Sequence, residues 1–414
     1  MRTRRVVVTG IGLITPLGND TPSSWKALCE GRSGIGLIQS FDASAMEVRI
    51  AGELKGFDPR PYMDQKEIRR NDPFVQYAMA ATRQAMADGE FAITEENADD
   101  VGVILGSGIG GLQTCHDQFK VLFDQGPGRI SPFFITKFIT DIAAGFVSMA
   151  INARGPNFAT VSACATGANA IGEAAEMIRR GDASAMLAGG SEAAISPLGI
   201  AAFASLHALS RRNDDPTHAS RPFDGERDGF VMGEGAGVLL LEERESARAR
   251  GARIYAELLS YASTADAYHV TEPAPNGAGL AQAMRRALEK AHLPPNAVTY
   301  INAHGTATPY NDKNESAAIR TTFGDHAYKL AVSSTKSMMG HTLGAAGGIE
   351  AGITALTVYH DVMPPTMNLT HADPECDLDY VPNVARRAEV PVALSNAMGF
   401  GGHNAVLVFG KERP

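Results

Sequence analysis

Short apolar runs alternate along the chain with Ala-rich stretches, and Gly-rich turns separate the two. This alternation is typical of α/β proteins, in which helices cover parallel strands that are apolar on both faces. Strands are expected at residues 6–9, 101–105, 185–188, 238–241, 298–302 and 406–409, the first of them running into a Gly turn. Helices are expected at residues 72–87, 166–180, 280–291 and 345–360. The sequence therefore predicts an α/β fold built on buried parallel strands.

Two pairs of segments suggest an internal repeat. Residues 101–108 resemble residues 298–305, each being an apolar run that ends in small residues, and residues 161–164 resemble residues 332–336. We interpret this similarity as two duplicated halves, 1–250 and 251–414, that face each other. Residues 112–160 have no counterpart in the second half and are predicted to be an insertion capping the first. The alternative is two unrelated α/β segments with a similar pattern.

Composition narrows the possible classes of protein. With 414 residues, the chain is too long for a single small core, and with 44% hydrophobic residues it is expected to fold rather than stay disordered. A formal net charge of -9 argues against nucleic-acid binding by the chain as a whole, although a local basic patch could recruit an acidic partner. No apolar run is long enough to insert into a membrane, so a cytoplasmic protein is expected.

Four cysteines lie far apart in the sequence, without the spacing of a zinc site, so neither disulfides nor a metal is expected. Cys164 differs from the others because it stands between an apolar run and the helix expected at 166–180. Unpaired N–H groups at a helix N-terminus favour the thiolate, so this thiol is predicted to be activated. Small residues around it leave room for a substrate. A lone cysteine is otherwise most often an inert core residue.

Two histidines and a lysine are the other candidates for chemistry. His304 follows the strand expected at 298–302, and His341 is expected to begin a helix. Open α/β sheets bind ligands at the carboxyl ends of their strands, although a single histidine is usually structural. Lys336 stands among Ser and Thr residues, which favours a buried polar network with Glu350 as partner over an exposed position.

A cysteine, two histidines and a lysine suit decarboxylative carbon–carbon condensation. The thiol accepts an acyl group, and a malonyl-type donor then loses CO₂ while hydrogen bonds stabilise its enolate oxygen. Neutral imidazoles can donate those bonds, and Lys336 adds positive potential. We therefore interpret the chain as a cysteine-nucleophile acyltransferase.

Two glycine motifs allow more than one interpretation. Residues 106–111 fit the G-x-G-x-x-G pattern of dinucleotide-binding folds, but the Gly126 turn interrupts the following helix and Asp124 is poorly placed to bind a ribose. Close backbone packing, with Ile109 facing a pocket, is the alternative. Residues 399–402 carry a single bulky side chain, Phe400, on a glycine loop, which suits a mobile gate or a plain hairpin turn.

Together these motifs resemble those of the β-ketoacyl-acyl carrier protein synthase family, in particular its elongating type II members. The resemblance covers the whole chain and includes residues 6–12, 220–224, 227–231, 233–237 and 399–402. It implies a thiolase-like fold of two duplicated α/β halves in a five-layer αβαβα sandwich, a homodimer, and no cofactor. It also implies extension of an acyl chain by two carbons from malonyl-carrier protein in fatty acid biosynthesis, with acyl carrier protein as partner.

The resemblance also implies individual roles. Cys164, His304 and His341 match the catalytic triad, Lys336 has Glu350 in support, and Asp312 is a further supporting residue. Backbone N–H groups of Cys164 and Phe400 match the oxyanion hole, with Phe400 as a gate between Gly399 and Gly401. At substrate-binding positions, Thr306 and Thr308 match residues that hold the pantetheine arm. Ile109, Phe203 and, from the other subunit of the dimer, Phe134 match residues around the acyl pocket. Phe230 matches a residue on the malonyl side.

Lys66, Arg69 and Arg70 match positions that meet the acidic carrier protein, whereas composition alone suggests a solvated helix face. The chain departs from the usual family pattern at four positions: Ala307, Met339, Met398 and His403. His403 lies next to the predicted gate, so the sequence does not determine the gating or the acyl preference.

Other functions remain possible from the sequence alone. A degradative thiolase would need a second cysteine in a Gly-rich strand end, which neither Cys115 nor Cys376 provides. A non-elongating partner subunit of a heterodimeric synthase would lack the nucleophile. A specialised polyketide-type ketosynthase and a nicotinamide-dependent enzyme remain as alternatives.

Overall fold

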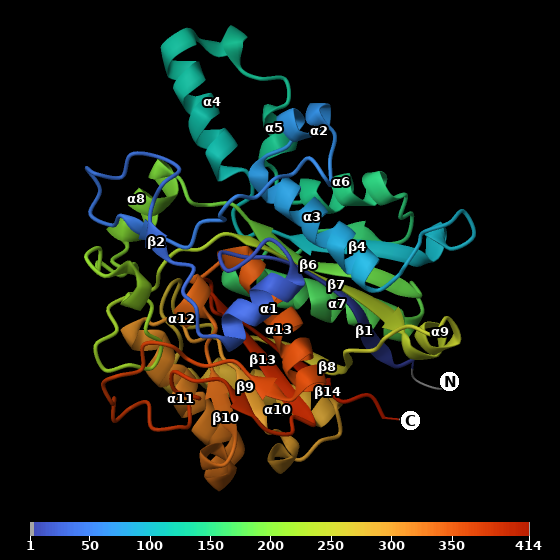
Figure 1. The fold of residues 1–414 in the computed structure, drawn as a ribbon, viewed down its shortest axis with the longest axis vertical. Coiled ribbons are helices and arrows are strands. Elements are labelled where there is room, and N and C mark those ends of the chain that lie inside the picture. The colour runs from blue at the N-terminus through green and yellow to red at the C-terminus, as the bar shows by residue number, and fades with distance from the viewer. Residues whose placement is uncertain (1–3, 414) are drawn as a thin grey trace.

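A mixed ten-stranded sheet runs through the computed structural model, which describes residues 4–413 (Figure 1). One group of five strands comes from the first part of the chain: β1 Val6–Ile14, β4 Val101–Gly106, β5 Asn157–Phe158, β6 Ala185–Glu192 and β7 Gly235–Glu243. The other group comes from the second part: β8 Ala256–Ala265, β9 Tyr300–Asn302, β10 Ala331–Ser333, β13 Val392–Gly399 and β14 His403–Gly410.

The two groups repeat one topology. The spatial order is β10-β9-β13-β14-β8 in one group and β5-β4-β6-β7-β1 in the other, joined where β8 pairs with β1. In each group the strand that comes third in sequence lies at the outer edge of the ten-stranded sheet. Equivalent neighbours in the two groups also pair in the same way, parallel or antiparallel. The segments that resemble each other in sequence therefore occupy equivalent places. This repeat supports a division near residue 250, which stays a prediction.

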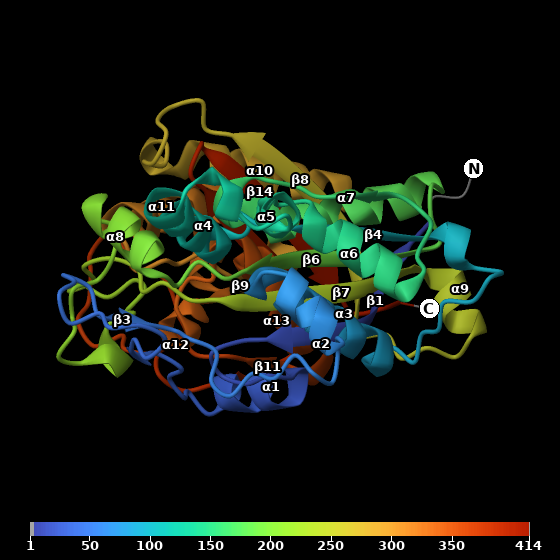
Figure 2. The same cartoon turned by 90° about the horizontal axis from the view of Figure 1, so that it is seen from above.

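Helices complete five layers, which confirms the predicted αβαβα arrangement (Figures 1 and 2). The outer helices of the first group are α3 Pro73–Asp88 and α6 Ile142–Ile151, and those of the second are α10 Ala278–Lys290 and α11 Pro309–Phe323. Between the two groups of strands lie α7 Thr166–Arg180 and α13 Ala346–His360.

The central helices α7 and α13 touch backbone to backbone. A Cβ atom added at Gly347 would lie 2.3 Å from the backbone nitrogen of Ala168, and one added at Gly167 would lie 2.5 Å from that of Gly348. Real Cβ atoms do not approach so closely, so only glycine fits at this crossing. The contact brings the N-terminal ends of both helices to the same place.

The first strand differs from its expected form. The Gly turn predicted after residue 9 is wrong, because β1 continues through Gly10 and Gly12 to Ile14. Added Cβ atoms at these glycines would lie 2.0 Å and 1.8 Å from carbonyl oxygens of α3. The glycines therefore let the α3 backbone lie directly on the strand.

The expectation of parallel strands is only partly correct. Parallel pairing is confined to β5-β4-β6 and β10-β9-β13, whereas the middle of the sheet is antiparallel. Strands β8 and β13 were not predicted at all. The helices agree more closely, since α7 has its expected bounds and α13 begins one residue later than expected.

The predicted insertion is shorter than residues 112–160. Helices α4 Leu112–Gln125 and α5 Phe134–Phe138 project from the body, at the top of Figure 1. Helix α6 and strand β5, however, belong to the layers of the first group.

The remaining elements are short. They are α1 Thr21–Cys29, β2 Gly36–Leu37, β3 Ile50–Ala51, α2 Gln65–Arg70, α8 Pro197–Ser205, α9 Arg244–Ala249, α12 Lys336–Met339, β11 Val362–Met363 and β12 Arg386–Arg387. Across residues 4–413, none of the helices combines the length and apolar character needed to cross a bilayer.

Candidate active site

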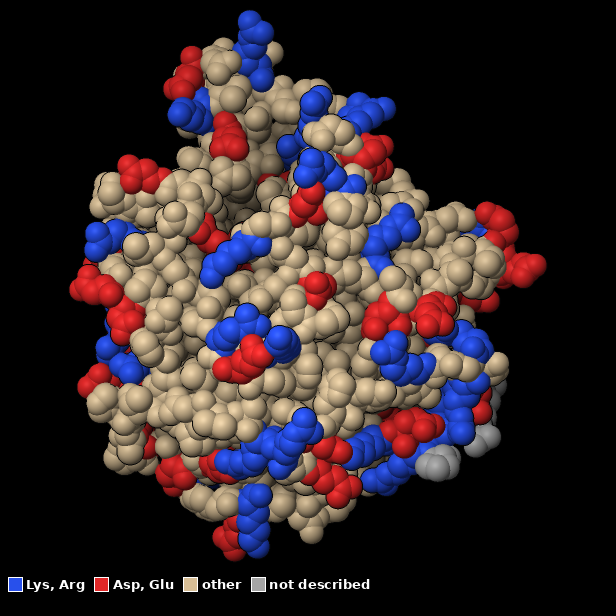
Figure 3. Space-filling model, viewed as in Figure 1, with Lys and Arg blue, Asp and Glu red and all other residues tan. Residues whose placement is uncertain are grey.

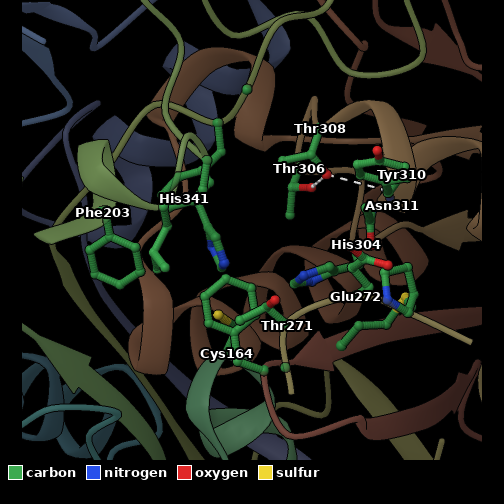
Figure 4. A pocket seen from close by; sticks show the side chains of 18 of the residues that line it. Cys164, Phe203, Thr271, Glu272, His304, Thr306, Thr308, Tyr310, Asn311 and His341 are labelled. Carbon is green, nitrogen blue, oxygen red and sulfur yellow. Dashed lines mark hydrogen bonds between the residues drawn. The ribbon is translucent and has the colours of Figure 1, made fainter. Parts of the chain in front are cut away.

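A cavity of about 310 Å³ opens where the two central helices begin. Its lining includes Cys164 from the first group of strands and helices and His304, His341 and Phe400 from the second. Figure 4 shows both imidazoles pointing into the space beside the Cys164 side chain. The structure therefore brings together four residues that lie up to 236 positions apart in the sequence.

Cys164 lies in a tight turn immediately before α7. The preceding residue, Ala163, has a φ of 49°, which is strained for a residue with a Cβ atom and is characteristic of functional turns. The Cys164 side chain is half-buried and packs in an apolar cluster with Ile109, Phe203 and Phe230. The backbone turn thus fixes the thiol at the cavity wall.

The resting thiol is protonated. Burial raises the pKa of Cys164 to about 12, and the positive charge of Lys336 together with a hydrogen bond from the backbone N–H of Phe400 lowers it only in part. The prediction of a thiolate favoured by the helix N-terminus is therefore wrong for the resting protein. Nucleophilic attack by this thiol requires a base in the site.

The glycine loop approaches the nucleophile closely at Gly399. A Cβ atom at this position would lie 2.6 Å from the carbonyl oxygen of Ser162 and 3.1 Å from the backbone nitrogen of Cys164. The bare backbone brings the N–H of Phe400 to the sulfur of Cys164. Gly401 also has a φ of 90°, which only glycine adopts readily.

His304 and His341 are almost fully buried and face each other. Their rings are nearly perpendicular, with centroids 5.2 Å apart, and the Nδ1 atom of each has no hydrogen-bond partner. Burial and the nearby charge of Lys336 hold the pKa of both imidazoles well below the usual value. Both rings are therefore neutral at pH 7 and can each donate one N–H bond.

Lys336 and Glu350 form a buried ion pair. Their side chains are 1% and 2% exposed, and Nζ of Lys336 donates to Oε1 of Glu350. The predicted buried polar network is confirmed, since residues 333–337 are all buried. Burial raises the pKa of Glu350 to about 7, while the lysine opposes the shift. The charge of Lys336 acts on the thiol and on both imidazoles.

Three buried side-chain oxygens near this pair lack partners: Asn302 Oδ1, Glu350 Oε2 and Asn396 Oδ1. Such atoms normally bind water or an ion. Among the described residues, no three His, Cys, Asp or Glu side chains are grouped as metal ligands.

Glu315 was missed from the sequence but holds the His304 backbone. Its Oε1 accepts the N–H of His304 at 2.9 Å, and its Oε2 accepts that of Gly305 at 2.8 Å. Asp312 holds the next turn, accepting N–H bonds from Phe223 at 2.8 Å and Ala307 at 3.2 Å. Glu315 lies three residues after Asp312 on α11, so both carboxylates are on the same face of the helix. This spacing was the sequence signal that could have identified Glu315.

The two predicted threonines line the cavity. Thr306 Oγ1 and Thr308 Oγ1 are 3.0 Å apart, and Thr308 also caps α11 (Figure 4). Two of the departures from the family pattern, Met398 and the exposed His403, line it too. Sequence reasoning missed other lining residues, of which four lie in irregular loops and two in the first turn of α11: His207, Asp228, Asp266 and Glu272, and Tyr310 and Asn311.

The predicted aromatic residues separate into two sets. Phe203 packs against Phe230 and Phe400, with ring centroids 5.7 Å and 6.5 Å away, and all three line the cavity. Ile109 lies behind them in the same apolar cluster. Phe134 is on the projecting helix α5, stacked on Phe138, and the single chain does not bring it to the cavity.

The three predicted basic residues lie on α2. Helix α2 has no buried residue, and Figure 3 shows Lys and Arg side chains gathered on this part of the surface. The Arg70 guanidinium lies 4.7 Å from the centre of the Phe133 ring, and Lys137 Nζ donates to the carbonyl oxygen of Arg69 at 3.3 Å. Lys66, Arg69 and Arg70 therefore adjoin the projecting segment.

Known proteins match the chain over its full length. Residues 3–247 match the family "Beta-ketoacyl synthase, N-terminal domain" and residues 255–370 match "Beta-ketoacyl synthase, C-terminal domain". The 3-oxoacyl-[acyl-carrier-protein] synthase 2 of Synechocystis sp. is 55% identical over 99% of this chain and 98% of its own length. The Staphylococcus aureus protein of the same name is 52% identical with the same coverage.

Two solved structures share the thiolase-like ketosynthase fold. A Burkholderia phymatum beta-ketoacyl synthase has a TM-score of 0.92 and 38% identity, covering 99% of this chain and all of its own. A type II polyketide ketosynthase solved with its acyl-carrier protein, AntDE:AntF, has a TM-score of 0.91 and 34% identity, covering both chains completely.

The protonated resting thiol predicts the pH dependence of alkylation. Below its pKa, the thiolate fraction of Cys164 rises tenfold per pH unit, so the rate with iodoacetamide should rise about tenfold per unit from about pH 7 to 9 without a plateau. Lys336→Met should slow alkylation because Lys336 lowers the thiol pKa, whereas Lys313→Met, on the surface, should not. Peptide mass spectrometry measures the rate at Cys164. A plateau near neutral pH would contradict this account.

Proposed function

The chain belongs to the beta-ketoacyl synthase family, and we propose that it is a 3-oxoacyl-[acyl-carrier-protein] synthase of fatty acid biosynthesis that uses Cys164 as nucleophile. One observation carries the proposal: the thiol and two neutral imidazoles line a single cavity, and the charge of a buried lysine acts on all three. The relatives named above support the choice of substrate.

In the first half-reaction, Cys164 Sγ attacks the thioester carbonyl of the acyl-carrier protein. A carbon–sulfur bond forms at Cys164, the bond to the pantetheine sulfur breaks, and the proton of Cys164 passes through a neutral imidazole to that leaving sulfur. Backbone N–H groups of Cys164 and Phe400 stabilise the oxyanion, because the loop at Gly399 brings them together at the sulfur.

In the second half-reaction, malonyl-carrier protein loses its carboxylate as CO₂. The electron pair of the broken bond forms an enolate, whose oxygen accepts N–H bonds from His304 and His341. The enolate carbon forms a bond to the acyl carbon on Cys164, the bond from that carbon to Cys164 Sγ breaks, and the thiolate released takes up a proton from water. A neutral imidazole donates one N–H bond and keeps its other nitrogen able to accept a proton. Burial and the charge of Lys336, which is paired with Glu350, hold both rings neutral.

The remaining lining residues take roles that fit their positions. Thr306 and Thr308 offer paired hydroxyls to the amides of the pantetheine arm, and Phe230 lies against His341 on the malonyl side, with ring centroids 5.3 Å apart. Ile109 and Phe203 border the acyl chain. Phe400 acts as a gate, turning on Gly399 and Gly401, and Asp312 holds the turn before Thr308.

We further propose a homodimer that acts in the cytoplasm. Strand β5 lies at the edge of the sheet, and large apolar side chains stay exposed around it, including Met149 at 73%, Val161 at 56% and Phe158 at 37%. An exposed apolar sheet edge favours pairing with a second copy. Such pairing would let Phe134 of the projecting helix α5 complete the acyl pocket of the other copy.

A two-step assay tests the proposed reaction. The protein is mixed with acyl-carrier protein thioester, the adduct on Cys164 is measured by mass spectrometry, and CO₂ release is followed after malonyl-carrier protein is added. Cys164→Ala should abolish condensation. Lys336→Ala and His304→Ala should leave acylation within severalfold of the original rate but slow the malonyl step by about 100-fold or more.

Each of the two steps gives a result that can refute the proposed reaction. An unmodified Cys164 in the original protein would refute the proposal, as would CO₂ release that His304→Ala leaves unchanged. Lys313→Ala on the surface of α11 serves as the control for loss of a lysine whose charge does not act on the thiol or the imidazoles.

The docking of the acidic carrier protein is proposed at Lys66, Arg69 and Arg70. Reversing these three charges to Glu should raise KM for the acyl-carrier protein at least about tenfold at low salt, with less effect at high salt because ions screen surface charges. The matched control reverses Arg285 and Arg286, two exposed arginines on α10 at the opposite outer layer. Equal changes in KM for both variants would contradict this docking site.

A further inference from the structure

Glu192 is a fully buried carboxylate at the end of β6 whose contacts the mechanism above does not use. Four uncharged donors converge on it. Oε1 accepts the hydroxyl of Ser107 at 2.7 Å and the N–H of Ile109 at 3.2 Å, and Oε2 accepts the N–H groups of Gly108 at 2.8 Å and Gly344 at 2.9 Å. A carboxylate held this way is costly to bury, so its retention calls for an explanation.

The four donors come from two distant parts of the chain. Ser107, Gly108 and Ile109 form the turn after β4, whereas Gly344 lies in the segment between His341 and α13. Both turns approach the carboxylate too closely for a side chain: added Cβ atoms at Gly108 and Gly344 would lie 2.8 Å and 2.7 Å from Oε2. Glu192 therefore joins a turn of the first group to a turn of the second.

Each joined turn carries a residue of the apolar cluster beside Cys164. Ile109 packs in the apolar cluster that contains Cys164 and Phe203, and Leu343, the neighbour of Gly344, belongs to the same cluster and lines the cavity. Leu343 has a φ of 52°, a strained conformation that the adjacent N–H bond to Glu192 helps to maintain. Loss of the bonds from Gly344 and from Gly108 and Ile109 would free both apolar side chains to move.

We propose that Glu192 is a positioning residue that sets the acyl-chain selectivity of the enzyme by fixing Ile109 and Leu343 relative to Cys164. This inference rests on the proposed function. The carboxylate touches no reacting atom. The hydrogen bonds of Glu192 set the distance between Ile109 and Leu343. Weakening these bonds widens the pocket and favours longer acyl chains.

The test compares acylation of Cys164 by carrier protein bearing a hexanoyl or a tetradecanoyl chain. Glu192→Gln replaces one acceptor oxygen with an amino group that cannot accept from Gly108 and Gly344. The ratio of kcat/KM for the long chain over the short chain should rise about tenfold, the range expected when a hydrophobic pocket changes its fit. Ser107→Ala, which removes one donor, should shift the ratio in the same direction by less.

The matched control is Glu242→Gln. Glu242 is buried on β7 opposite Ala185, at the other end of β6, and pairs with Arg250. That variant should lose thermal stability but keep the ratio within twofold. Residues with a merely structural role change the amount of folded protein, not the ratio between chain lengths.

The results separate this inference from the proposed function. If the unaltered protein forms no acyl adduct, the proposed function fails. If it does so, and both Glu192→Gln and Ser107→Ala leave the ratio unchanged or lower it, the inference about Glu192 is overturned. Should Glu192→Gln not fold, Ser107→Ala alone decides between these outcomes.

Discussion

The glycine crossing between α7 and α13 is the contact on which the site depends. A glycine inside a helix costs roughly 0.5–1 kcal/mol relative to alanine, so Gly167, Gly347 and Gly348 each weaken their own helix. Alanine at Gly347 would place its methyl group 2.3 Å from a backbone nitrogen of the other helix and force the two apart. The chain accepts the local cost because the close approach brings Cys164, just before α7, to the segment that carries His341 and leads into α13.

The electrostatics of the site follow from burial and a single lysine. Removal from water favours the neutral form of Cys164 and of both imidazoles, and Lys336 favours the neutral form of the imidazoles as well. For the thiol the two effects oppose each other, and burial wins. The result is a division of roles. The sulfur relies on a base and on two backbone N–H groups, while the imidazoles keep their N–H bonds for a developing enolate.

Local patterns predicted the parts of this structure that are local. The Ala-rich run of α7 and the apolar run of β4 each form a complete element by themselves, and the glycines beside His304 and His341 mark strand and helix ends. Strand β8 was missed because Ser260, Ser263 and Thr264 interrupt its apolar character, although its neighbours on both sides bury most of it. The antiparallel centre of the sheet depends on pairing between distant strands, which no local pattern contains.

Glu192 was missed for the same reason. Glu192 accepts from Gly344, 152 residues away, and its donors are backbone N–H groups that any residue carries. The protonation state of Cys164 likewise depends on how much of the folded chain surrounds it. Such features appear only when the two groups of strands come together.

A crystal structure of the protein acylated on Cys164 would show which groups bind the acyl carbonyl oxygen. The account predicts the acyl carbonyl oxygen at about 3 Å from the backbone nitrogens of both Cys164 and Phe400, with the rings of His304 and His341 still free to bind the donor. A carbonyl oxygen bound instead to either imidazole would contradict the division of roles between the backbone and the histidines.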